Sequence, residues 1–276
     1  MSSNQPGQMP KLPIPGVKNL IAIGSGKGGV GKTTVAVNLA VALASQGHRT
    51  GLMDADVYGP NVPLMMGINR TPMAHGDRIQ PLEQFGVRLM SMGFLNPGDR
   101  PVIWRGPMLH SVIQQFLRNV DWGELDYLII DLPPGTGDVQ LSLIQTAPIG
   151  GAIVVTTPSD VSLEDARKAV HMFSQVKVPV LGIVENMSYL DCPHCHERID
   201  VFSTGGGRRT AQEMGVYFLG ELPLTADVRV GGDTGRPVAL AEASPAGAAF
   251  GTLAKNAIAR LAEAGAPAGP NIEITD

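Results

Sequence analysis

The sequence predicts an α/β fold with a doubly wound, mostly parallel sheet flanked by helices. Short apolar stretches suited to buried strands recur along the chain. Segments of helical composition separate them, and this alternation is typical of βαβ units and a parallel sheet. A glycine-rich stretch, GSGKGGVGKTT at 24–34, stands between the first such strand and the first such helix. These three observations together predict the fold class.

Each expected strand is a short apolar stretch. The first, NLIAIGS at 19–25, stops at glycine and is expected to be buried. The stretch YLIIDLPPG at 127–135 is a strong buried strand that runs directly into a turn. In chain order, strands are expected over residues 19–25, 49–57, 85–95, 127–135, 151–160, 178–189 and 216–224.

The expected helices follow from composition and from residues that start or end a helix. Residues 35–47 contain Ala, Val and Leu with no helix breaker before Gly47, which is expected to end the helix. Residues 107–120 have helical spacing after a proline, a residue favoured in the first helical turn. In chain order, helices are expected over residues 35–47, 107–120, 161–176, 205–215 and 244–264.

Composition and charge exclude several classes of protein. The 276 residues are 43% hydrophobic and 17% charged, which suits a globular protein with a sizeable core. A net charge of −4 gives no general attraction to nucleic acid or to anionic lipid. No apolar run reaches the roughly 18 residues of a membrane span. The first seventeen residues lack a secretion signal and hold one Lys and no Arg, unlike a mitochondrial presequence. We therefore expect a cytoplasmic protein with neither nucleic-acid nor membrane partners.

The glycine-rich stretch contains a complete phosphate-binding motif. Residues 26–33 fit G-x-x-x-x-G-K-[ST], between an expected strand and an expected helix, which is the context that the motif requires. Glycines let backbone N–H groups turn towards an anion, and the helix dipole adds to the attraction. Lys32 is expected to reach the β- and γ-phosphates of ATP, and the Thr33 hydroxyl to ligate Mg²⁺. The loop residues expected to contact nucleotide are Gly26, Gly28, Gly29, Val30, Gly31, Lys32, Thr33 and Thr34.

A second lysine, Lys27, lies five residues before Lys32. So close to the first glycine of the loop, it is expected to point away from its own helix start. It could then supply positive charge to a phosphate from the far side, as an arginine finger does. The run KGGVGKT resembles the "deviant" Walker A motif of the SIMIBI-type P-loop ATPases, which include MinD, ParA, ArsA and the nitrogenase iron protein. That resemblance implies a homodimer in which Lys27 crosses the interface to the partner's nucleotide.

Three aspartates follow expected strands, and the same resemblance implies their roles. Carboxylates beside a magnesium–triphosphate site hold the metal or orient the attacking water. By resemblance, Asp54 belongs to the metal shell, Asp56 orients the water, and Asp131 is the Walker B acid. Asn186 lies near the end of the expected strand 178–189, and its amide could pair with an adenine edge. In proteins that this one resembles, such an Asn contacts the base with a proline nearby, here Pro223.

The only two cysteines form a C-x-x-C pair, Cys192 and Cys195. Two thiolates so spaced bind a soft metal from one loop, but the pair could be a redox dithiol, half a zinc site or half an iron–sulfur site. His194 and His196 could complete a zinc site within one chain. Alternatively, two-fold symmetry would bring two such loops together and offer four thiolates to a bridging [4Fe–4S] cluster.

The whole pattern resembles the Mrp-type (ApbC-like) iron–sulfur cluster carrier ATPases, within the MinD/ParA superfamily. That resemblance implies a P-loop ATPase domain over residues 18–264, which includes the cysteine loop. Residues 1–17 and 265–276 are expected to be flexible tails. It also implies an upstream cluster scaffold and apo-protein clients as partners. The matching segments are SGKGGVGKTT, DADVYGPNVP, PVIWRGPM, IDLPPGTGDVQLSL, ENMSYLDCPHC and GGDTGRPV.

Two other functions compete with that of a cluster carrier. A MinD- or ParA-like dimer switch, with zinc or a structural role at the cysteines, would use the phosphate loop alone. The acidic, weakly apolar C-terminus and the net charge disfavour a membrane or DNA surface for it. A reductase like the nitrogenase iron protein would have cluster cysteines far apart in sequence. Only an ATP-dependent carrier uses both the phosphate loop and the paired thiols.

Overall fold

The computed structural model describes residues 12–95, 106–192, 194, 195 and 197–265. Its centre is an eight-stranded sheet with the strand order β12-β9-β8-β1-β7-β2-β6-β5. All neighbouring strands are parallel except β5 and β6. This confirms the expected mostly parallel sheet. The strands are β1 (Val17–Gly24), β2 (Thr50–Asp54), β5 (Leu82–Gln84), β6 (Val87–Ser91), β7 (Leu125–Asp131), β8 (Gly151–Thr156), β9 (Val180–Glu185) and β12 (Phe218–Glu221).

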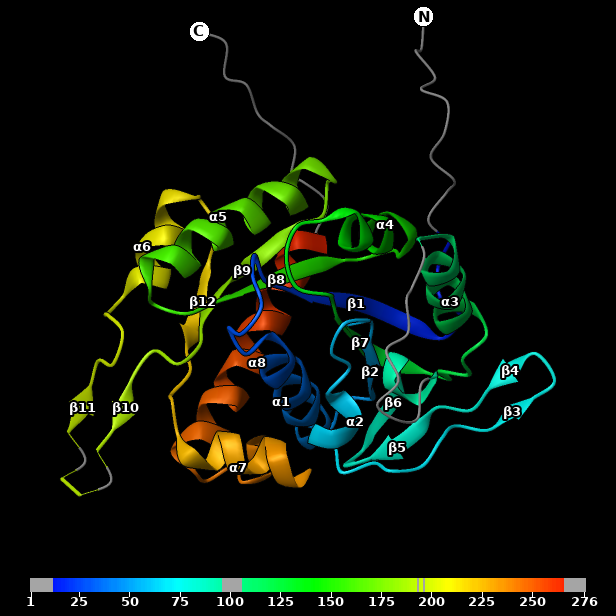
Figure 1. Cartoon of the computed structure of the whole chain (residues 1–276), viewed down its shortest axis with the longest axis horizontal. Coiled ribbons are helices and arrows are strands. Elements are labelled where there is room, and N and C mark those ends of the chain that lie inside the picture. The colour runs from blue at the N-terminus through cyan, green and yellow to red at the C-terminus, as the bar shows by residue number, and fades with distance from the viewer. Residues whose placement is uncertain (1–11, 96–105, 193, 196, 266–276) are drawn as a thin grey trace, which may run out of the picture.

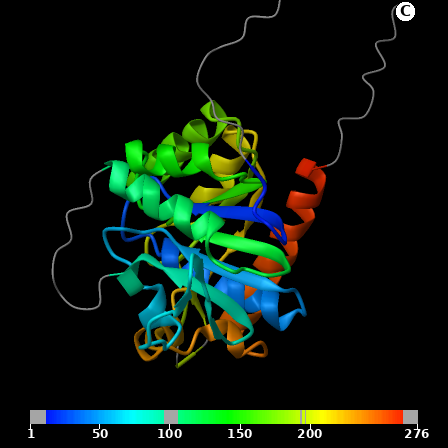
Figure 2. The same ribbon diagram turned by 90° about the vertical axis from the view of Figure 1, so that its right-hand side faces the viewer.

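Helices cover both faces of the sheet, as a doubly wound fold requires. Figure 1 shows α3, α4, α5 and α6 on one face and α1, α7 and α8 on the other. In the view of Figure 2, α8 lies on the side of the sheet away from α3 and α4. The helices are α1 (Lys32–Ser45), α2 (Val62–Met65), α3 (Gly106–Arg118), α4 (Asp138–Thr146), α5 (Asp160–Gln175), α6 (Gly206–Glu213), α7 (Ala226–Thr234) and α8 (Pro245–Gly265), with short 3-10 helices η1 (Met92–Leu95) and η2 (Val238–Leu240).

Helix α1 lies inside the molecule because it packs against the sheet and against α8 at once. Ten of its fourteen residues are buried, and most of these are Ala, Val or Leu. An apolar composition all around a helix is expected when the helix is covered on every side. Burying one Leu or Val side chain stabilises the fold by about 1.5–3 kcal/mol. The core therefore holds the start of α1, and with it the glycine-rich loop, in a fixed place against the sheet. Among the described residues, no helix is both long enough and apolar enough to span a bilayer.

Residues 12–17 of the expected N-terminal tail contact the rest of the domain through Ile14, although Leu12, Pro13 and Pro15 are exposed. This corrects the expectation of a flexible tail for these residues. Ile14 is only 3% exposed and belongs to the core. Arg118 at the end of α3 donates hydrogen bonds to the backbone carbonyls of Pro13 and Leu12, at 2.7 and 2.9 Å. Strand β1 also begins at Val17, two residues earlier than expected. One apolar side chain and a distant arginine, neither visible as a local pattern, hold this segment. Residues 1–11 and 266–276 of the expected tails lie outside the described part.

Several short elements were not predicted. The expected strand 85–95 is instead a turn, then β6 and then η1, because Phe85 and Gly86 have φ of +51° and +73° and reverse the chain between β5 and β6. Helices α2, α4 and α7 follow loops and are too short to show a clear period. Two hairpins also stand outside the main sheet. They pair β3 (Ala74–His75) with β4 (Arg78–Ile79), and β10 (Leu190–Asp191) with β11 (Arg198–Ile199).

A cluster of charged side chains lies at the amino end of β7. Asp126 accepts from Lys18 Nζ at 2.9 Å and from the Arg49 guanidinium at 2.9 and 3.2 Å, and also from the Arg49 backbone N–H. Arg49 and then Lys18 hold the pKa of Asp126 well below its usual range. One carboxylate thus joins the chain before β2 to β1 and β7.

We predict that Asp126→Asn lowers the free energy of unfolding at pH 7 by about 1 kcal/mol, a value discounted for solvent screening. A carboxyl group whose pKa is depressed by folding stabilises the folded state above its unfolded pKa. The difference between wild type and variant should therefore shrink as pH falls below about 4. Urea denaturation at pH 7 and pH 3 measures it. Glu263→Gln, which breaks an exposed pair with Arg260, is the control and should change stability less. A wild-type advantage that persists unchanged at pH 3 would contradict the prediction.

Candidate functional site

Three neighbouring strands bring the candidate residues to one edge of the sheet. The strands β1, β7 and β2 are adjacent and parallel, so their carboxyl ends share one edge. The glycine-rich loop follows β1, while Asp131 ends β7 and Asp54 ends β2 directly opposite it in register. In open α/β sheets this edge is where ligands bind. Residues that are about a hundred positions apart in sequence therefore meet here.

The glycine-rich loop has a conformation that most side chains would not allow. Gly29 and Gly31 have φ of +82° and +83°, in the left-handed region. A Cβ at Gly31 would lie 2.1 Å from Asn186 Nδ2, so that position also lacks room for a side chain. At Gly28 and Gly29 nothing lies within 4 Å of where a Cβ would be. The open space there fits a phosphate cradle built from backbone N–H groups.

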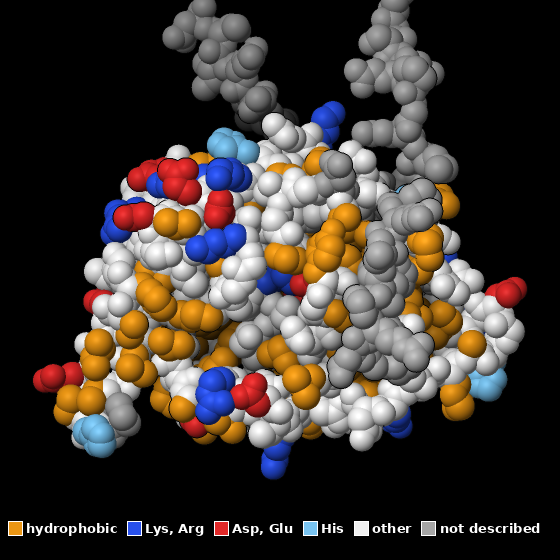
Figure 3. Space-filling model, viewed as in Figure 1, with side chains coloured by type: hydrophobic (Ala, Val, Ile, Leu, Met, Phe, Trp, Pro, Cys, Tyr) orange, Lys and Arg blue, Asp and Glu red, His pale blue; other side chains and the backbone are white. Residues whose placement is uncertain are grey.

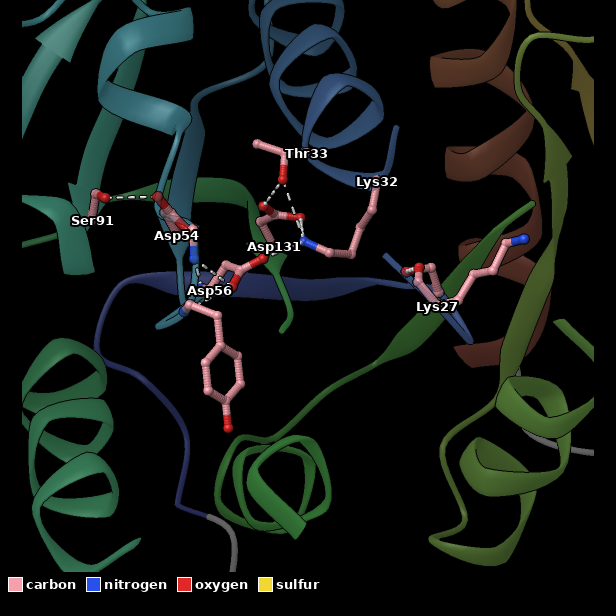
Figure 4. Close-up of polar contacts among 10 residues, drawn as sticks. Lys27, Lys32, Thr33, Asp54, Asp56, Ser91 and Asp131 are labelled. Carbon is pink, nitrogen blue, oxygen red and sulfur yellow. Dashed lines mark hydrogen bonds and ion pairs between the residues drawn. The ribbon is translucent and has the colours of Figure 1, made fainter. Parts of the chain in front are cut away.

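Lys32 and Thr33 both contact Asp131 in the structure. Lys32 Nζ lies 2.7 Å from Asp131 Oδ1, and Thr33 Oγ1 donates to Asp131 Oδ2 at 2.7 Å. Asp131 is fully buried and the Lys32 side chain nearly so. Figure 4 shows both side chains directed at the same carboxylate. The hydroxyl and carboxylate oxygens form a set of donors that suits Mg²⁺.

Asp56 and Asp54 occupy different positions. Asp56 Oδ2 lies 3.5 Å from Lys32 Nζ, while its Oδ1 accepts the backbone N–H groups of Tyr58 and Gly59. Asp56 therefore faces the loop. Asp54 is fully buried, and its two oxygens accept from Ser91 Oγ at 2.7 Å and from the Asp56 backbone N–H at 3.1 Å. In this arrangement Asp54 holds the chain that carries Asp56.

Burial changes the acidity of two of these groups. Burial, and then the neighbouring Asp131 charge, raise the pKa of Asp54 to about 8. Burial also raises the pKa of Asp131, against the opposing effects of Lys32 and Thr33. A buried carboxyl group beside another one favours its neutral form. The site can thus hold three aspartates around one lysine without carrying three full negative charges.

Lys27 is not part of this cluster. Its side chain is partly exposed, and Figure 4 shows it directed away from Lys32 and Asp131. The Lys27 carbonyl accepts from Ser25 Oγ at 2.9 Å, which helps to hold the turn. Among the described residues, none forms an ion pair with its ammonium group. The contact with a partner's nucleotide stays a prediction.

A pocket of 510 Å³ opens beside the glycine-rich loop. Three of the expected nucleotide contacts, Thr34, Asn186 and Pro223, line it together. The buried Asn186 also donates from Nδ2 to the Val30 carbonyl at 2.9 Å, so it touches the loop and the pocket. The space suits a nucleoside at the end of the phosphate cradle. Met187 and residues of α2 and α7 complete the wall.

The two cysteines lie in the hairpin formed by β10 and β11, at some distance from the main sheet (Figure 1). The Cys192 backbone N–H donates to the Glu197 carbonyl at 2.9 Å and closes the hairpin. The backbone N–H groups of Cys195 and His194, and then the Cys195 thiol, hydrogen-bond the Cys192 sulfur and lower its pKa. A thiol stabilised as thiolate is prepared for a metal. Cys195 is exposed, so the pair is accessible from outside.

No within-chain metal site is complete in the described part of the chain. No three His, Cys, Asp or Glu side chains gather there at distances that could hold an ion. His194 is exposed, and His196, the other candidate for a zinc ligand, lies outside the described residues. Apolar side chains lie at the end of β11 and just after it, with Ile199, Val201 and Phe202 about half exposed. Figure 3 shows hydrophobic side chains gathered at this corner.

Sequence reasoning missed several residues of the site. Ser91, which holds Asp54, ends a strand whose boundaries gave no sign of a polar contact. Helix α7 forms one wall of the pocket and was not predicted. Its start carried a usable signal, because Thr225 accepts from the Val228 N–H at 3.3 Å as a helix N-cap.

A family model described as "ParA: NUBPL iron-transfer P-loop NTPase" matches residues 16–258. The chain belongs to this family. It is 48% identical over 265 residues to the Arabidopsis thaliana "Iron-sulfur protein required for NADH dehydrogenase, mitochondrial", which covers 95% of this chain and 85% of that protein. It is 55% identical over 230 residues to the "Iron-sulfur cluster carrier protein" of Deinococcus radiodurans, which covers 83% of this chain and 65% of that protein.

Solved structures agree with the fold of this NUBPL-type protein. A nucleotide-binding protein from Archaeoglobus fulgidus in complex with ADP superposes with a TM-score of 0.71 at 38% identity, over 83% of this chain and 90% of that chain. The cell division ATPase MinD of Pyrococcus furiosus gives a TM-score of 0.67 at 25% identity, over 88% and 99%. The resemblance to cluster carriers within the MinD/ParA superfamily is thus confirmed at the level of the family.

The raised pKa of Asp54 gives a testable pH dependence. A carboxyl group whose pKa rises on folding stabilises the protein below its unfolded pKa, and that contribution is lost between about pH 4 and pH 8. An amide does not titrate. We therefore predict that Asp54→Asn gains stability relative to wild type as pH rises from 5 to 8, by on the order of 2 kcal/mol. Denaturation of the nucleotide-free protein at each pH measures this.

The matched control for Asp54→Asn is Asp77→Asn, at an exposed position in the turn between β3 and β4. It should show no such trend. A constant difference between Asp54→Asn and wild type across this range would mean that Asp54 is ionised throughout.

Proposed function

We propose that this protein binds and hydrolyses ATP and carries a [4Fe–4S] cluster, which two copies hold between them and pass to apo-proteins. One observation carries the proposal. A complete phosphate-loop site and a pair of free thiols, one of them exposed, occur on the same domain, and the thiols supply only half of a four-thiolate set. Relatives that are 45–55% identical and carry names of iron–sulfur cluster carrier or transfer proteins support it.

The residues of the phosphate loop and the three aspartates would have different roles in hydrolysis. Lys32 would leave Asp131 for the β- and γ-phosphates, and the loop N–H groups from Gly26 to Thr33 would hold the phosphate chain. Thr33 and Asp131 would hold Mg²⁺, with Asp54 supporting that shell from behind. When bound, Mg²⁺ neutralises the charge that develops on the phosphates. Asp56 would orient the water whose oxygen bonds to the γ-phosphorus as the bond to ADP breaks.

The base would sit in the 510 Å³ pocket, against Thr34, Asn186 and Pro223. Asn186 Nδ2 is already used by the Val30 carbonyl, so its Oδ1 is the atom available to accept from an adenine amino group. Lys27 would reach the phosphates bound by a second copy, since its own site lies behind it. That direction of Lys27 supports a homodimer formed around ATP.

The cluster is cargo rather than a fixed cofactor. Two sulfurs in each of two copies, Cys192 and Cys195, would provide four thiolates. A site on an exposed hairpin releases its cargo more readily than a buried one. The apolar Ile199, Val201 and Phe202 give client proteins or an upstream scaffold a surface beside the thiols. Free thiols fit a reducing compartment such as the cytoplasm.

The two lysines should have separable effects. Lys32→Gln, whose amide can still pair with Asp131, should weaken ATP binding about 100-fold or more, or roughly 2.7 kcal/mol. Lys27→Gln should bind ATP nearly as wild type does but lose hydrolysis by about 10³-fold, the scale of an arginine finger. Calorimetry measures binding and phosphate release measures turnover. Equal loss of binding in both variants would show that Lys27 serves its own nucleotide instead.

The cysteines are tested by anaerobic reconstitution with iron and sulfide, followed by metal analysis and oligomer mass. Wild type should hold about four irons and four sulfides per two chains. Cys195→Ala should lose them and stay folded, while His194→Ala should keep them. If Cys195→Ala retained full iron and sulfide, the bridging site would be wrong. One tightly bound zinc per chain, lost in His194→Ala, would instead favour a nucleotide-driven dimer switch.

A further inference from the structure

One short segment joins the nucleotide pocket to the thiols. Asn186 touches the glycine-rich loop and lines the pocket, and Cys192 lies only six positions later. Between them, Met187 lines the pocket and has φ of +54°, a left-handed conformation that costs a non-glycine residue about 1 kcal/mol or more. Such a conformation persists only where the surroundings hold it. Contacts on both sides of the segment provide that support.

The segment is bonded to the opposite wall of the pocket. The Ser188 N–H donates to the Leu222 carbonyl at 2.9 Å, and the Leu224 N–H donates to the Tyr189 carbonyl at 2.7 Å. Pro223, between those two partners, lines the pocket. These bonds make residues 186–189 and 222–224 one rim. A ligand that moves one side of this rim must also move the other.

A buried carboxylate holds the rim from behind. Glu185, fully buried at the end of β9, accepts from Ser188 Oγ at 2.6 Å and from the Gly207 N–H at the start of α6. Breaking a hydrogen bond to a buried charged group is costly. Glu185 therefore holds the rim on the side of β9 and α6, and from the rim the chain continues directly into the hairpin.

The hairpin is fastened to the same rim by one arginine. The Arg198 guanidinium lies 4.4 Å from the centre of the Tyr189 ring and pairs with Glu221 at 3.0 Å, directly before Leu222. It also pairs with Asp200 at 2.9 Å. Arg198 begins β11, directly after Glu197, whose carbonyl bonds Cys192. We define the Arg198 clamp as Arg198 with Tyr189 and Glu221.

We propose that the Arg198 clamp is a positioning device that transmits nucleotide occupancy to the cysteine pair. One anchor, Tyr189, belongs to the rim of the nucleotide pocket, and the other, Glu221, directly precedes it in the chain. The arginine belongs to β11, the second strand of the thiol hairpin. Nucleotide that orders the rim would therefore order the hairpin and shield Cys192 and Cys195. The inference rests on the proposed function, because it assigns regulation to that site.

The Arg198 clamp is better suited to fixing the orientation of the hairpin than to stabilising the fold. Arg198 is 42% exposed, and exposed ion pairs contribute only about 0–1 kcal/mol. Its loss should leave the fold intact and free only the orientation of the hairpin, since β10 and β11 are just two residues each. A cation over an aromatic ring, together with a carboxylate, fixes both the distance and the direction of the guanidinium.

The test measures the alkylation rate of the two thiols by iodoacetamide, in the anaerobic full-length protein without cluster. We expect ADP with Mg²⁺ to slow alkylation of the wild type by about fivefold, a modest coupling between two sites. Arg198→Gln should lose this dependence while binding ADP within about twofold of wild type. Glu221→Gln should lose part of it. Thermal melting of each variant shows that the fold is retained.

The matched control is Arg260→Gln. Arg260 lies 4.1 Å from the Tyr217 ring centre and pairs with Glu263, the same combination of contacts, but on α8. It should respond to nucleotide as wild type does. Alkylation that ignores ADP in a wild type that binds ADP would overturn the coupling and leave the ATPase proposal standing. A full response in Arg198→Gln would overturn the role of the clamp. No ADP binding in wild type would overturn the proposed function and the coupling with it.

Discussion

The buried pair between Lys32 and Asp131 is the interaction on which the site depends. Both side chains are inside the protein, where an unpaired charge is far more costly than at the surface. Removing one partner of such a pair typically costs about 3–5 kcal/mol. Lys32 can therefore leave Asp131 only if a phosphate takes the lysine and a cation takes the carboxylate. Nucleotide binding at this edge of the sheet therefore exchanges the partners of Lys32 and Asp131. It does not simply add a ligand to empty space.

The balance of charge around that pair follows the same logic. Three aspartates surround one lysine, and burial raises the pKa of Asp54 to about 8, so the cluster is less negative than its composition suggests. Asp54 then serves its neighbours through hydrogen bonds from Ser91 and the Asp56 backbone. Asp56 keeps one oxygen on the turn at Tyr58 and Gly59 and presents the other to Lys32. Each carboxylate has a different position and hence a different task.

The cysteine hairpin obeys a different constraint. Two thiols on an exposed two-stranded hairpin have little core to hold them. Arg198 contacts Tyr189 and Glu221 and so connects the hairpin to the rim of the nucleotide pocket. The thiols must be accessible for cluster transfer, yet they must also be held in a defined position. These two requirements compete. The fold meets both by fastening a protruding hairpin to a rim that is itself seated on the buried Glu185.

The features that could be predicted from the sequence are contiguous patterns. Buried strands, the helix after the glycine-rich loop and the C-x-x-C pair are contiguous patterns, and composition and spacing reveal them directly. The arrangement of the site depends on contacts between distant segments, and only the tertiary structure reveals these contacts. It placed Asp131 against Lys32, put Ser91 behind Asp54, packed Asn186 against Gly31, and built a pocket wall from α7. It also packed Ile14 into the core, where composition had indicated a flexible tail. Spacing along the chain carries no information on such pairs, since a parallel sheet sets its neighbours by strand order and not by sequence.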